Sequence, residues 1–96
     1  MDIKKEIVKI IRNRLELPRY KVFLFGSRAT AEAGERSDYD IGIEAEEEIP
    51  VDVLIDIKDD IDNLPVMQKI EVVDFKKVGQ DFKEVALRNV EVLYEK

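Results

Sequence analysis

Apolar residues recur along the chain at spacings that alternate between those of a helix and those of a strand. Isoleucine and leucine repeat at helical spacing after Asp2, a good N-cap residue, and this pattern predicts a first helix over residues 3–15. An aromatic and branched run over 20–25 stops at Gly26 and predicts a short strand buried on both faces. Ser27 is a candidate start for a short helix.

Residues 38–44 show a strict alternation of a different kind. Their period of two predicts a strand with one polar face, on which two aspartates point in the same direction. The polar face holds Asp38, Asp40, Gly42 and Glu44, and the other face holds Tyr39, Ile41 and Ile43.

The second half of the chain continues to alternate between helix and strand. Residues 50–62 fit either a strand or a helix, and we predict a helix because Pro50 suits a first turn and a strand of that length would be unusual in so small a domain. We then expect a strand over 70–75, a helix over 81–90 with one apolar side, and a final short strand over 92–94. With no repeats and short connections, this pattern predicts one small α/β domain with one modest core.

Composition narrows the cellular setting. The chain of 96 residues is 45% hydrophobic and 40% charged and contains no cysteine, which is typical of a globular protein in a reducing, cytoplasmic environment. The apolar stretches are far shorter than the roughly 20 residues needed to cross a bilayer, and the first residues have no signal-peptide core. We therefore expect neither secretion nor a membrane span.

Charge is distributed unevenly along the chain. The net charge is −6, yet residues 1–21 carry seven Lys or Arg against three acids, and residues 31–62 carry thirteen acids against two basic residues. An acidic chain repels phosphate backbones, so nucleic acid is an unlikely direct partner. The acidic segment is either a solvated face or a site for a divalent metal.

Candidate chemistry concentrates between Phe25 and Asp40. A buried strand that runs through Gly26-Ser27 into a helix start offers backbone N–H groups and a hydroxyl to a phosphate, although many such turns are only conformational. Asp38 and Asp40 are about 7 Å apart along one face of a strand. Two such carboxylates suit Mg²⁺, which prefers oxygen ligands, but they also suit a solvent-facing edge strand.

Together these residues resemble a family signature. Gly26-Ser27, ten further residues and Asp38-x-Asp40 are similar to the motif of the polymerase-β nucleotidyltransferase superfamily, above all to its minimal bacterial and archaeal members. The match is carried by Phe-Leu-Phe-Gly-Ser-Arg-Ala at 23–29 and Ser-Asp-Tyr-Asp-Ile at 37–41. It continues through residues 69–75, which are similar to the strand of the third carboxylate, and reaches Phe82 and the tail at 93–95.

The resemblance implies a fold and a reaction centre. It implies a single nucleotidyltransferase domain over residues 1–96, with a mixed sheet, helices packed on it and two Mg²⁺ ions. By resemblance, Gly26 lets the backbone approach a nucleoside triphosphate, Ser27 binds a phosphate oxygen, and Arg28 pairs with phosphate or with an acidic partner. Asp38 and Asp40 would bind the metals.

The third carboxylate departs from the commonest family pattern. Glu71 holds the position that is usually aspartate, and related transferases that modify antibiotics also use glutamate there, so Glu71 is our predicted third metal ligand and catalytic base. Asp74 is the rival. Because Asp74 is three residues later, it should face the opposite side of the strand, and we favour Glu71.

The resemblance also suggests an acceptor for the nucleotide. Minimal nucleotidyltransferases are commonly paired with a small helical HEPN protein, and such a transferase can adenylylate a tyrosine of this toxin. We therefore expect transfer of AMP from ATP to a HEPN-type partner, with an antitoxin role. The alternative is a catalytically weak module that binds nucleotide or sequesters a partner without turnover.

Overall fold

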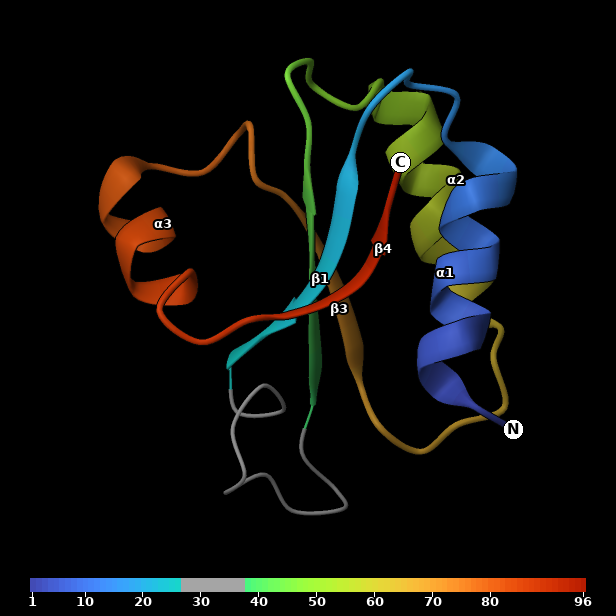
Figure 1. Cartoon of the computed structure of the whole chain (residues 1–96). Coiled ribbons are helices and arrows are strands. Elements are labelled where there is room, and N and C mark those ends of the chain that lie inside the picture. The colour runs from blue at the N-terminus through green and yellow to red at the C-terminus, as the bar shows by residue number, and fades with distance from the viewer. Residues whose placement is uncertain (27–37) are drawn as a thin grey trace.

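The computed structural model describes residues 1–26 and 38–96 and contains a four-stranded sheet with helices on both faces (Figure 1). Helices α1 and α2 cover one face, and α3 lies over the other. The elements, in chain order, are α1 (Ile3–Arg14), β1 (Lys21–Phe25), β2 (Tyr39–Glu44), α2 (Val51–Asp62), β3 (Ile70–Asp74), α3 (Gln80–Ala86) and β4 (Glu91–Glu95).

The sheet is mixed and has the strand order β3-β2-β1-β4. Strand β1 pairs antiparallel with both β2 and β4, whereas β2 and β3 are parallel and are joined through α2. A parallel pair needs such a crossover connection, and a helix commonly supplies it. The predicted fold class, an α/β domain with a mixed sheet and helices packed on it, is confirmed.

The main core lies between the sheet and the two helices α1 and α2. Asp2 caps α1 as predicted, because its Oδ1 accepts a hydrogen bond from the Lys5 backbone N–H at 3.2 Å. The buried residues of this core come from α1, α2, β1, β2, β3 and the short segments next to them. They are Ile7, Ile11, Leu15, Tyr20, Val22, Leu24, Tyr39, Ile41, Ile43, Ile49, Ile57, Ile61 and Val72.

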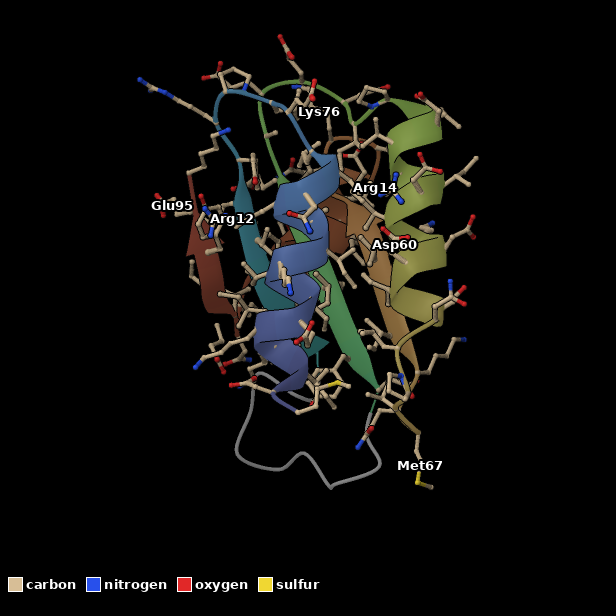
Figure 2. All side chains as sticks on the ribbon, turned by 90° about the vertical axis from the view of Figure 1, so that its right-hand side faces the viewer. Arg12, Arg14, Asp60, Met67, Lys76 and Glu95 are labelled. Carbon is tan, nitrogen blue, oxygen red and sulfur yellow. The ribbon has the colours of Figure 1, made fainter. Side chains whose placement is uncertain are left out.

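Arg14 joins the two helices at their outer surface through ion pairs with Asp60 and Asp56. Arg14 of α1 donates from Nε to Asp60 Oδ2 at 2.8 Å and from Nη2 to Asp60 Oδ1 at 3.2 Å, and Figure 2 shows the two side chains meeting between α1 and α2. The hydrogen bond from Arg14 lowers the pKa of Asp60. This two-pronged contact fixes how α2 lies beside α1.

The other face of the sheet carries a small aromatic cluster. Phe23, Phe25 and Phe75 are buried there, and Phe82 of α3 packs edge-on against Phe25 and Phe75 with ring centroids 5.9 and 5.7 Å away. Gly42 lies beneath the cluster, where an added Cβ would come within 2.6 Å of Phe23 Cε2. The face of β2 that holds Asp40, Gly42 and Glu44 is therefore polar only toward the ends of the strand. This corrects the prediction of a polar face along the whole strand.

Helix α3 is shorter than predicted. The pattern predicted a helix over 81–90, but α3 ends at Ala86 and has no buried residue. Phe82 is its aromatic contact with the sheet, while Val85, on the expected apolar side, is 64% exposed. The helix ends early because the chain must turn before β4 begins at Glu91 and pairs with β1.

The remaining predicted elements agree with the structure. Residues 50–62 form helix α2 rather than a strand, with Pro50 at its N-cap, and the predicted short strand over 92–94 lies within β4. The predicted helix start at Ser27 falls outside the described residues. Within the described part of the chain, no helix is long and apolar enough to cross a membrane.

Candidate active site

Strands β2 and β3 bring the predicted acidic residues to one end of the sheet. In the pairing register, Phe25 at the end of β1 lies opposite Asp40, and Asp40 lies opposite Glu71 across the parallel β2–β3 pair. Since paired residues share a face, Asp40 and Glu71 lie side by side on the face that carries the aromatic cluster. Asp40 is partly buried, and Asp38 and Glu71 are exposed. The structure thus places Glu71 beside Asp40, as predicted.

Gly26 follows β1 and lies directly against the Asp40 carboxylate. Its φ is +76°, a left-handed conformation that side chains other than glycine rarely adopt. A Cβ at this position would collide with Asp40 Oδ2. Glycine is therefore required both for the turn and for room beside the Asp40 carboxylate, a contact that the sequence did not predict.

The ionised form of the Asp40 carboxyl is destabilised by its surroundings. Its burial, then the nearby Glu71 and Asp38 carboxylates, raise the pKa of Asp40 above its ordinary value, and Lys69 partly offsets this. Asp40 and these two neighbouring acids together create a region of negative potential. A cation placed there would relieve the repulsion among them.

Lys69 supplies a positive charge next to this cluster. Its Nζ lies 2.9 Å from Glu71 Oε1, and this bond, followed by the charge of Glu71 and then those of Asp38 and Asp40, raises the pKa of Lys69. Lys69 lies in the stretch 69–75 that resembles the family, and the resemblance assigns it no role. Its spacing of two residues from Glu71, which puts both on one face of a strand, was the available signal.

Asp74, the rival third carboxylate, lies elsewhere. It is 4% exposed, on the side of β3 that faces the main core, where its Oδ2 accepts from the Ile49 N–H and its Oδ1 from the Lys76 N–H, both at 2.9 Å. Oδ2 thus joins the end of β3 to the segment before α2, and Oδ1 closes the turn that follows β3. This contact gives Asp74 a structural role away from Asp40.

A family comparison connects this geometry to an activity. The sequence model of the family described as polymerase beta, nucleotidyltransferase matches residues 5–96. The chain belongs to this family. It is a nucleotidyltransferase, and the match runs through every strand that contributes to the carboxylate cluster.

A named relative and two solved complexes are similar to this nucleotidyltransferase. A Haemophilus influenzae protein named probable protein adenylyltransferase MntA is 31% identical over 100 residues, covering 100% of this chain and 86% of that protein. A chain in the complex of the tri-AMPylated Shewanella oneidensis HEPN toxin with MNT antitoxin has a TM-score of 0.72 at 15% identity, covering 96% of this chain and 69% of that one. A chain in a toxin–antitoxin complex with AMP-PNP has a TM-score of 0.76 at 16% identity, covering 95% and 72%. At these identities the two complexes show the fold.

The donor set of this nucleotidyltransferase suits a hard cation, but its acids are not gathered into a ready-made cage. Among the described residues, no group of three or more acidic side chains is close enough to hold one metal ion. Asp40 and its two acidic neighbours nevertheless repel one another, and carboxylate oxygens are what Mg²⁺ prefers. Ser27 and Arg28, the other predicted site residues, lie outside the described residues.

One groove lies away from the carboxylates. It has a volume of about 550 Å³ and runs between α1 and β4, with Lys5, Lys9 and Arg12 among its lining residues. Arg12 is held with its guanidinium 4.7 Å from the centre of the Tyr94 ring. The groove therefore contains none of the predicted catalytic residues.

Proposed function

We propose that this nucleotidyltransferase transfers AMP from ATP to a tyrosine of a HEPN-type toxin and so acts as its antitoxin. The observation that carries the proposal is the register that sets Asp40 beside Glu71, with Gly26 packed against the Asp40 carboxylate. The relative named as a probable protein adenylyltransferase supports AMP as the group transferred. The reaction would take place in the cytoplasm, where ATP is available.

In the proposed reaction, the tyrosine oxygen attacks the α-phosphorus of ATP. A bond forms between this oxygen and phosphorus, the bond from phosphorus to the bridging oxygen breaks, and pyrophosphate leaves. Glu71 accepts the tyrosine proton on a carboxylate oxygen, because it is exposed at the cluster and free of the core. Gly26 allows the triphosphate to approach the backbone, and we assign phosphate contacts to Ser27 and Arg28.

Asp38, Asp40 and Glu71 are the residues that would hold Mg²⁺, with two ions expected. When bound, Mg²⁺ would neutralise charge on the triphosphate and on the leaving pyrophosphate. The repulsion that raises the pKa of Asp40 supports this assignment, since it makes the cluster favourable for positive charge.

The partner is inferred from similar proteins. The Shewanella oneidensis structure is described as an MNT antitoxin in complex with a tri-AMPylated HEPN toxin. We infer the same class of partner here, a small helical HEPN-type protein, and a modified tyrosine on it as the product.

Transfer of label from ATP to the partner tests the proposal. The protein would be incubated with Mg²⁺, ATP labelled at the α-phosphate and a co-expressed HEPN-type partner, and we expect label on a partner tyrosine. Glu71→Gln should reduce transfer by about 100-fold or more, because a general base is lost, while Mg²⁺·ATP affinity changes little. Glu71→Asp should retain transfer.

Asp74→Asn is the matched control on the same strand. Because Asp74 faces the core, this variant should keep most of its transfer activity per folded molecule. Loss of transfer in Asp74→Asn with normal transfer in Glu71→Gln would contradict the assignment of the third carboxylate.

A module that binds its partner without turnover is the second candidate. It is favoured by two observations: Glu71 is engaged by Lys69, and the described acids form no group able to hold a metal. Stable capture of the partner with no label on it, in wild type and in Glu71→Asp alike, would support this candidate over the enzyme.

A further inference from the structure

The backbone fixes Lys69 beside the candidate active site. The Lys69 carbonyl oxygen accepts a hydrogen bond from the Tyr39 N–H at 2.8 Å, immediately before β3 pairs with β2. Tyr39 lies between Asp38 and Asp40 in the sequence. The Lys69 side chain therefore starts from a backbone position that is tied to the strand of the two aspartates.

The ammonium group of Lys69 contacts one of the three candidate metal ligands and is influenced by the charges of the other two. It forms an ion pair with Glu71 at 2.9 Å, and it also interacts with the charges of Asp38 and Asp40. Among the ion pairs of the described residues, the Lys69–Glu71 pair is the one that includes Asp38, Asp40 or Glu71. A single exposed ion pair is usually weak, but here one cation offsets the repulsion of three carboxylates.

We propose that Lys69 is a positioning residue that acts as a tethered counter-ion for Asp38, Asp40 and Glu71 and competes with divalent cations for the Glu71 carboxylate. The proposal rests on the proposed function, because it takes these acids as the metal ligands. A Glu71 oxygen that accepts from Lys69 has less capacity to bind a second cation. Lys69 thus sets how readily the cluster takes a metal and keeps Glu71 oriented at the side of Asp40.

Metal affinity in the absence of nucleotide tests the proposal. Mn²⁺ would be titrated by calorimetry into wild type, Lys69→Gln, Lys69→Arg and Lys77→Gln. Removing the charge at position 69 should tighten Mn²⁺ binding by roughly three- to tenfold, since one positive charge near the metal position is lost. Lys69→Arg keeps the charge and should bind Mn²⁺ as wild type does.

Lys77→Gln is the matched control for total charge. It changes the net charge of the protein by the same amount, but Lys77 lies near Asp74, at 4.0 Å, rather than near the cluster. Its Mn²⁺ affinity should equal that of wild type. In a Glu71→Gln background, the effect of Lys69→Gln should fall to less than half, because the two residues act on one another.

Failure of the role proposed for Lys69 and failure of the proposed metal site would give different results. Equal Mn²⁺ affinity in wild type and Lys69→Gln, or an equal gain in Lys77→Gln, would overturn the role of Lys69 and leave the proposed function intact. Wild type that binds no Mn²⁺, or binding that survives Asp38→Asn with Asp40→Asn, would overturn the metal site and the role of Lys69 together.

Discussion

Ionisation of the Asp40 carboxyl lowers the free energy of unfolding. Its pKa in the folded protein is raised above the ordinary value of 3.8, first by burial and then by Glu71 and Asp38. The folded state therefore binds the proton more tightly than the unfolded state. This contribution to stability is present below the ordinary pKa and is lost as the pH rises through the folded pKa.

Asp40→Asn should accordingly raise the free energy of unfolding at pH 7. The gain should shrink toward pH 3, where Asp40 is protonated in both states of the wild type. Urea unfolding at both pH values measures this difference, and Asp52→Asn on the exposed side of α2 is the control, expected within about 0.5 kcal/mol of wild type. A stability gain for Asp40→Asn that is the same at both pH values would contradict this account.

Gly26 is the other residue on which the site geometry depends. Gly26→Ala should destabilise the protein by about 1–2 kcal/mol, because the alanine must hold a left-handed φ. Its Cβ should also displace the Asp40 carboxylate, and so weaken Mg²⁺·ATP binding beyond the loss of stability. Binding measured on the folded protein separates the two effects. Gly79→Ala is the control, because a Cβ at Gly79 meets no atom within 4 Å.

At the level of elements, Asp74 joins the end of β3 to the segment before α2. Its two hydrogen bonds to the Ile49 and Lys76 N–H groups are made by a side chain that is 4% exposed. Asp74→Ala should cost about 2–3 kcal/mol of unfolding free energy, because buried donors lose a charged acceptor. Glu71→Gln, on the exposed side of the same strand, should stay within about 0.5 kcal/mol of wild type. Equal losses in the two variants, measured by urea unfolding, would contradict this division of roles.

Most elements could be predicted from local patterns, because their periodicity matches what they bury. Ile7 and Ile11 recur at helical spacing and are buried in α1, and Tyr39, Ile41 and Ile43 alternate and face the main core. The early end of α3 could not be predicted, since the pairing of β4 with β1 decides where the helix must stop.

Part of the candidate site could also be predicted from local patterns. Strand parity placed Glu71 on the opposite side from Asp74, and the register agrees. Gly26, which follows β1, contacts Asp40 of β2, and Lys69 pairs with Glu71 where β3 begins beside β2. Such contacts depend on how strands are aligned with one another, which no single stretch of sequence contains.

In the whole molecule, a basic groove and the candidate acidic site lie on different elements. The groove lined by Lys5, Lys9 and Arg12 lies between α1 and β4, whereas Asp38 and Asp40 lie at the start of β2 and Glu71 lies beside Asp40 on the edge strand β3. The net charge of −6 thus does not describe either region.

The pairing of Asp40 with Glu71 across parallel strands also has a consequence for folding kinetics. The two residues are separated by the whole of α2, so they meet only after the crossover has closed, and contacts of this kind form slowly. If β3 docks after the main folding barrier, Mg²⁺ will bind the native protein but not the transition state. Added Mg²⁺ should then slow unfolding and leave the folding rate unchanged in stopped-flow measurements, whereas faster folding with Mg²⁺ would mean that the strands are already paired at the barrier.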